Sequence, residues 1–169
     1  METKNNTAIT AEPERQELMV IREFEAPREL VFEAFTKAEH FEKWMGPCEI
    51  LDMNLERFEP YSGGSYRFIQ SDEDGNSYAF RGVYHEVTAP ERIIQTFEFE
   101  GLPEPGHVTL ETATFESLPG DRTKVILHSV FKSVEGRDGM LQSGAEKGIR
   151  DSHSKLDELL EELKSTKLA

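Results

Sequence analysis

The apolar positions after residue 20 change their spacing at Pro27. Val20 and Phe24 fall on one parity of an alternating segment, which predicts a strand over 16–25. Because proline fixes φ and lacks an N–H group, it ends a strand and suits a first helical turn. The apolar residues that follow recur at helical spacing and predict a helix over 28–37.

A second short helix is predicted over 38–45. It carries Phe41 and the only tryptophan, Trp44, three residues apart on one face, and Gly46-Pro47 marks its end.

Beyond Pro47 the pattern becomes a series of strands separated by turn residues. The predicted strands are 49–58, 64–71, 77–88, 91–100, 107–117 and 122–131. Most gaps are short, so neighbouring strands are expected to pair antiparallel as a meander. Gly82 interrupts an aromatic face and predicts a bend or bulge there.

The ends of the chain complete the arrangement. Residues 1–14 are predicted to be a tail, disordered over 1–6, with a short extra strand at 7–10 that turns back onto the next one. A long helix is predicted over 134–165, with an interruption near Gly139. We predict a single α+β domain over 15–166, because a curved antiparallel sheet must cover one face and only this helix is long enough to do so.

Composition narrows the classes of partner. The chain of 169 residues has 33 acidic and 19 basic residues, a formal net charge of −14. No cluster of Lys and Arg is visible, which argues against nucleic acid and against an anionic membrane surface. One cysteine excludes an internal disulfide, and neither a signal-like segment nor a membrane-spanning run is present. We therefore expect a cytoplasmic protein, monomeric or homodimeric.

Five motifs carry a resemblance to a known family. In chain order they are Arg22-Glu-Phe-Glu-Ala-Pro-Arg-Glu-Leu-Val-Phe, Lys43-Trp-Met-Gly-Pro, Gly63-Gly-Ser-Tyr, Gly82-Val-Tyr-His-Glu-Val with Pro90-Glu-Arg, and Met140-Leu-Gln-Ser-Gly leading to a final Leu-Asp-Glu-Leu. From about residue 16 to 165 the chain resembles the START-like or SRPBCC superfamily. Within it, the chain is similar to the branch of the C-terminal domain of activators of the 90-kDa heat-shock protein ATPase.

The resemblance implies a helix-grip fold with a cavity between the last helix and the sheet. Gly144, Gly148 and Ser152 are predicted to lie on the inward face of that helix. They either clear volume for a ligand or let the helix approach a strand closely. The aromatic residues either line the cavity or simply form the core, and the resemblance places Trp44 at the cavity mouth. The predicted ligand-binding residues are Phe35, Trp44, Tyr66, Phe68, Phe80, Tyr84, Phe97, Met140, Gly144, Gly148 and Ser152.

Metal and cofactor sites are not predicted. The five histidines lack the spacing of a zinc motif, although His153 and Asp157 are four residues apart on a helix. Cys48 has the acidic neighbours Glu49 and Asp52, which favour a structural thiol over a reactive one.

Three functions are compatible with these observations. The first is binding of a small hydrophobic or amphipathic molecule, without chemistry of its own. The second is a cavity enzyme of cyclase or hydrolase type, for which His128, Glu86 or Tyr84 would have to face inward. The third is an interaction module that contacts the chaperone, as the resembled activators do.

Overall fold

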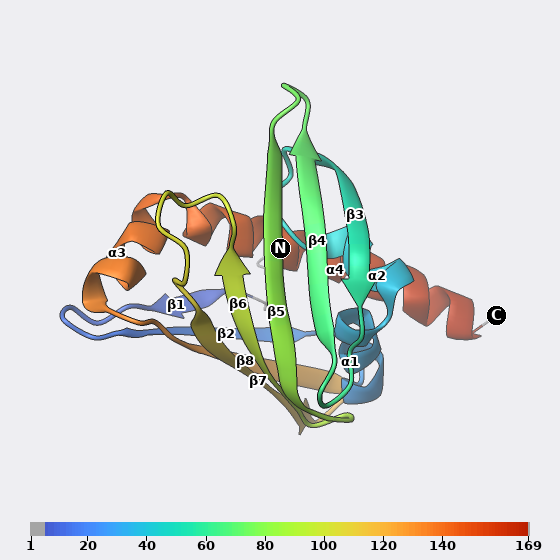
Figure 1. Ribbon diagram of the computed structural model, residues 1–169. Coiled ribbons are helices and arrows are strands. Elements are labelled where there is room, and N and C mark those ends of the chain that lie inside the picture. Colours follow the sequence, from blue (N-terminus) through green and yellow to red (C-terminus); the bar gives the residue numbers. More distant parts are fainter. Residues whose placement is uncertain (1–5, 169) are drawn as a thin grey trace.

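A computed structural model describes residues 6–168, as an eight-stranded sheet with four helices (Figure 1). The elements are β1 (Ala8–Thr10), β2 (Glu17–Phe24), α1 (Arg28–Thr36), α2 (Ala38–Trp44), β3 (Ile50–Phe58), β4 (Ser65–Asp72), β5 (Ser77–Thr88), β6 (Arg92–Phe99), β7 (Thr109–Leu118), β8 (Arg122–Val130), α3 (Val134–Gln142) and α4 (Ala145–Leu168). Each predicted strand is present, with ends that differ by at most two residues. The disorder predicted for residues 1–6 falls mostly on residues 1–5, which lie outside the described residues.

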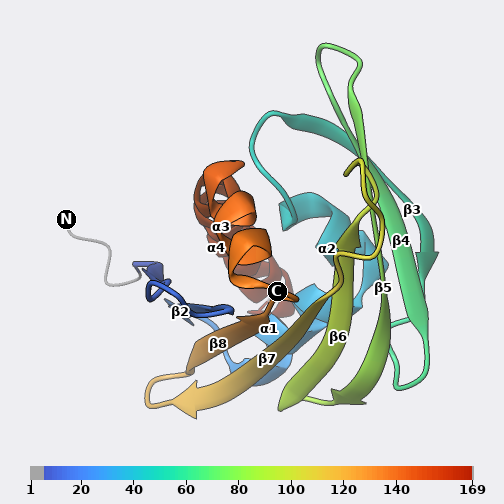
Figure 2. The ribbon, with the colours of Figure 1, turned by 60° about the vertical axis from the view of Figure 1, so that its left-hand side comes forward.

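The sheet is antiparallel throughout, in the order β1-β2-β8-β7-β6-β5-β4-β3. The strands from β3 to β8 pair with their sequence neighbours, as predicted, and β2 closes against β8. Figure 2 shows the strands curving around the helical layer. The fold is therefore α+β and of the helix-grip type. None of the helices within residues 6–168 combines the length and apolar character that crossing a membrane requires.

The change of spacing at Pro27 is the point at which β2 gives way to α1. Along β2 alternate side chains are buried, ending at Phe24. Pro27 then caps α1 with a φ of −66°. Strand β8 stabilises the turn between β2 and α1, because the hydroxyl of Thr123 on β8 donates a hydrogen bond to the Ala26 carbonyl at 2.7 Å.

The C-terminal helix differs from the prediction. Residues 134–165 form two helices, and the break lies at Ser143-Gly144 rather than near Gly139. Gly144 has a φ of +93°, in the left-handed region that interrupts a right-handed helix. The Ser133 hydroxyl caps the start of α3 by accepting from the Gly136 N–H at 2.9 Å.

A group of almost inaccessible apolar side chains lies between the sheet and helices α1, α2 and α4. Its central members are each at most 2% exposed, and we call them the packed core: Phe24, Val31, Phe115, Val125, Leu156 and Leu160. A separate, smaller cluster of Leu18, Val20 and Phe131 lies toward α3.

Candidate functional site

The inner face of the sheet has a second region that is not closed off. Strand register places Gln95, Glu111 and Ser129 side by side on β6, β7 and β8, on the same face as the buried Ala113 and Phe115. These three side chains keep part of their surface accessible although they face the helices. Two aromatic side chains behave in the same way on this face. We call this set the open patch: Phe80, Gln95, Phe97, Glu111 and Ser129.

A chain of hydrogen bonds links the open patch to the buried Tyr66. Tyr66 on β4 donates its hydroxyl proton to the Thr96 carbonyl at 2.5 Å. The Gln95 side-chain amide donates to the Tyr66 hydroxyl at 3.2 Å and to Oε1 of Glu111 at 3.3 Å. One phenol, one amide and one carboxyl group from three strands, β4, β6 and β7, are thereby held together.

Gly82 is the residue that makes this arrangement sterically possible. It pairs with Tyr66 across β4 and β5, and a Cβ atom there would collide with the Tyr66 hydroxyl and with the Thr96 carbonyl. The predicted irregularity in β5 exists, but the register shift lies between Tyr84 and Glu86. Gly82 instead lets the Tyr66 ring cross β5 to reach β6.

The electrostatics of the site distinguish its members. Burial raises the pKa of the Glu111 carboxyl to about 7, against a smaller opposing effect of the Gln95 hydrogen bond. Burial, and then the charge of Glu111, raise the pKa of Tyr66 well above its usual value. Burial likewise raises the pKa of Tyr84. Glu111 is therefore the member of this group that changes its charge near neutral pH.

The predicted ligand residues on the sheet lie in or beside this site. Phe80 and Phe97 belong to the open patch, with ring centroids 5.4 Å apart. Tyr66, Phe68 and Tyr84 are buried next to it, each at most 5% exposed.

Phe35 and Trp44 belong elsewhere. Trp44 is 2% exposed, donates its ring N–H to the Ala34 carbonyl at 2.8 Å, and lies 4.7 Å from the Phe35 ring. Phe35 in turn packs against Phe115 in the packed core, at 5.1 Å. The expectation of Trp44 as a residue at a cavity mouth is corrected: its side chain fills the core.

The helical residues do not form the predicted stripe. Gly144 is exposed in the turn between α3 and α4, and Met140 packs in the smaller cluster. A Cβ atom added at Gly148 would have Cδ of Pro47 as its nearest neighbour, at 4.0 Å. The Ser152 hydroxyl accepts from the Gly46 N–H at 2.8 Å and lies 3.2 Å from its carbonyl. Ser152 therefore joins α4 to the loop after α2, whereas Gly148 is not required for a close approach.

The proton-transfer candidates from the sequence are also redistributed. His128 lies on the outer face, where its Nε2 is 3.0 Å from Oε1 of Glu17. Glu86 pairs with Arg92 at 2.5 Å. Tyr84 alone faces inward. Glu111 was missed, although its parity within 107–117 matches that of Ala113 and Phe115 and would have placed it on the inner face.

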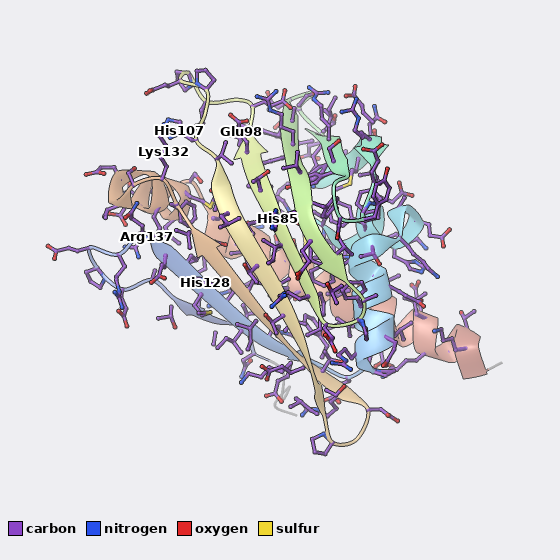
Figure 3. The ribbon with its side chains drawn as sticks, turned by 60° about the horizontal axis from the view of Figure 1, so that its bottom comes forward. His85, Glu98, His107, His128, Lys132 and Arg137 are labelled. Atoms are coloured by element: carbon purple, nitrogen blue, oxygen red, sulfur yellow. The ribbon has the colours of Figure 1, made fainter. Side chains whose placement is uncertain are left out.

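The histidines come from separate elements. Figure 3 shows His85 on β5, His107 in the loop before β7 and His128 on β8, spread over the sheet. Within residues 6–168 no three His, Cys, Asp or Glu side chains are grouped as metal ligands would be. His153 is buried, and its Nδ1 lies 2.9 Å from the Thr7 hydroxyl.

Two surface pockets lie outside the open patch. One of about 290 Å³ lies open to solvent between α2, β3 and α4, and its lining includes Met45, Met53 and Lys155 together with the exposed Cys48. The other, of about 190 Å³, lies beside Glu25 and α4. Neither contains a predicted ligand residue.

Comparison with known proteins gives a family and a set of similar folds. The family described as Activator of Hsp90 ATPase homolog 1-like protein matches residues 25–161. A solved protein from Arthrobacter aurescens is 24% identical with a TM-score of 0.82, covering 92% of this chain and 91% of its own. One from Rhodobacter sphaeroides is 22% identical with a TM-score of 0.82, covering 92% and 98%. One from Staphylococcus epidermidis is 25% identical with a TM-score of 0.78, covering 90% and 94%. No functionally curated protein matches the chain.

Proposed function

The chain belongs to the activator of Hsp90 ATPase homolog 1-like family, a START-like branch with the helix-grip fold. From this premise we propose that it binds a small hydrophobic or amphipathic molecule between α4 and the inner face of the sheet. The observation that carries the proposal is the difference in accessibility along that face. Side chains of the packed core are at most 2% exposed, whereas those of the open patch keep accessible surface.

The chemistry of the open patch supports a small-molecule site. Such sites combine a mostly apolar lining with a few fixed polar groups. Phe80 and Phe97 supply stacked aromatic surface, while Gln95 and Glu111 are held in place by hydrogen bonds.

The polar members also explain why this region would not close into dry core. A buried polar group without a hydrogen bond costs about 1–3 kcal/mol. The hydrogen bond from Gln95 reaches Oε1 of Glu111. Within residues 6–168, Oε2 has no hydrogen-bond partner and keeps accessible surface. Oε2 is therefore free to bind a guest molecule or water.

The test is a binding measurement with a variant that fills the patch. We expect native mass spectrometry of freshly purified protein to show a co-purified molecule, and the neutral fluorophore N-phenylnaphthylamine to bind the emptied protein. Ser129→Phe should abolish both because it projects a ring into the patch. Thr112→Phe is the matched control, since Thr112 lies on the opposite face of the sheet.

The proposal fails if the wild-type protein neither carries a guest nor binds the fluorophore. It also fails if the two variants, both shown to be folded by circular dichroism, bind equally well.

A cavity enzyme is the second candidate, and Glu111 favours it. A carboxyl group with a pKa near 7 suits general acid–base catalysis at neutral pH. A screen of ester and cyclisable polyketide substrates would test this. We expect Glu111→Gln to remove turnover while fluorophore binding persists, and turnover that survives the substitution would exclude the mechanism.

A contact with the chaperone named in the family description rests on a different surface. Val83 and Leu110, 52% and 47% exposed, flank Thr96 on the outer face of the sheet. Exposed apolar patches of this kind often mark protein contacts. Val83→Ser with Leu110→Ser should then weaken any stimulation of the chaperone ATPase, and wild-type protein without effect on that rate would exclude the contact.

A further inference from the structure

Glu111 is an acidic side chain on the inner face without a basic partner. Within residues 6–168 it takes part in no ion pair with Lys, Arg or His. The two buried arginines are committed elsewhere. Arg22 pairs with Asp157 at 2.5 Å, and Arg137 donates to the Glu12 carbonyl at 2.7 Å and pairs with Asp138. A bound anion would find no counter-charge at the open patch, whereas a bound cation would find one.

Aromatic side chains share this face with Glu111. Register places Tyr84, Gln95 and Glu111 in one row across β5, β6 and β7. Phe97 lies two residues along β6 from Gln95 and stacks on Phe80. Aromatic faces attract cations and also pack against apolar chains.

We infer that the open patch binds the protonated amino group of an apolar amine, with the Glu111 carboxylate as its counter-ion and the aromatic rings around its hydrocarbon part. This inference rests on the proposed function and adds the charge and chemical class of the guest.

A cationic guest is favoured over a neutral one because it stabilises the ionised form of Glu111. The Glu111 carboxylate has one hydrogen bond from Gln95 and, among the described residues, no basic partner, and its partial burial raises its pKa to about 7. A neighbouring ammonium group stabilises the ionised form and is stabilised by it. The net charge of −14 also raises the local concentration of cations around the protein.

The experiment compares three guests that share one hydrocarbon chain, namely decylamine, decanol and decanoate. Each competes with N-phenylnaphthylamine at pH 8, where Glu111 is ionised. We expect decylamine to bind at least about tenfold more tightly than decanol, and decanoate to bind most weakly. Glu111→Gln should reduce the preference for the amine at least about tenfold while decanol binding is retained.

Glu116→Gln is the matched control because it removes the same charge from the same strand, at an exposed position on the outer face. It should change the amine preference less than about twofold. Equal binding of decylamine and decanol, or an amine preference that survives Glu111→Gln, overturns the inference while the proposed function stands. If no guest and no fluorophore binds, the proposed function itself fails.

Discussion

The packed core and the open patch lie on the same face of one sheet and differ in how the helices cover them. Helix α1 adds Val31 to the packed core, α4 adds Leu156 and Leu160, and Trp44 of α2 packs in the same buried cluster. The open patch has polar groups at three adjacent register positions and keeps accessible surface. Alternation along a strand therefore decides which side chains face inward, while the covering helices decide whether they are sealed.

Each region also holds one titratable group whose burial opposes its charge. Beside the packed core, His153 lies edge-on to Phe24, 5.5 Å between ring centroids, and burial lowers its pKa to about 3. In the open patch burial raises the pKa of Glu111 to about 7. Because one group is a base and the other an acid, the two regions should respond to pH in opposite directions.

The largest expected effect comes from truncating one phenylalanine in each region. Phe115→Ala should lower the free energy of unfolding by about 3–5 kcal/mol, because Phe115 is 1% exposed and its ring packs at 5.0 Å from Phe32. Phe97→Ala should lower it by about 1–2 kcal/mol, because the Phe97 ring already keeps accessible surface. Urea unfolding followed by circular dichroism measures both, and equal losses would contradict the distinction between the regions.

The second effect is the response of the open patch to rising pH. The folded-state pKa of Glu111, about 7, lies above its ordinary value of 4.5. The stability associated with its neutral form is therefore complete below pH 4.5 and is lost as the pH rises to about 7. The loss is up to about 3 kcal/mol, and Glu111→Gln should not show it.

The measurement is the free energy of unfolding at pH 5 and pH 8 for the wild type, Glu111→Gln and Glu116→Gln. Only the first substitution should flatten the difference relative to the wild type. A Glu111→Gln profile parallel to that of the wild type would show that Glu111 is solvated like a surface carboxylate.

The packed core should respond to falling pH. His153 has a folded-state pKa of about 3 against an ordinary value of 6.5, so its contribution is present above pH 6.5 and is lost on acidification. Between pH 6.5 and pH 5 the loss is about 2 kcal/mol. His153→Gln should reduce this slope, whereas His128→Gln on the outer face should preserve it. Equal slopes in the two variants would contradict the burial of a neutral His153.

The two regions also differ in how far the sequence predicts them. Pro27, the turn residues and the alternating strands place every element of the sheet, and the motifs lead to the family. The packed core follows from this. For the neighbouring Trp44, the sequence does not reveal that it donates a hydrogen bond to the Ala34 carbonyl and is buried. Local spacing carries no information on such a contact between two helices.

The open patch was predicted only in part. Its aromatic residues Phe80 and Phe97 were identified, but the polar group was not, because Gln95 and Glu111 come from different strands. Their proximity depends on register, which is set by the whole meander. The expected stripe from Gly144 to Ser152 was wrong in geometry because the positive φ of Gly144 starts a new helix.

The smallest expected effects concern the helical layer that spans the two regions. Gly144 separates α3, which packs through Met140 in the smaller cluster, from α4, which packs on the packed core. Gly144→Ala should destabilise the fold by about 1 kcal/mol, because an alanine is strained at a φ of +93° even though the space around it is open.

Gly148→Ala should stabilise the fold by about 0.5–1 kcal/mol, because Gly148 lies inside α4 and an added methyl group meets only Pro47 at 4.0 Å. Thermal unfolding of the two variants should show shifts of opposite sign. A destabilising Gly148→Ala would mean that α4 has no room to spare above the loop after α2. Fluorophore binding unchanged in Gly148→Ala would separate the packing of α4 from the site at Glu111.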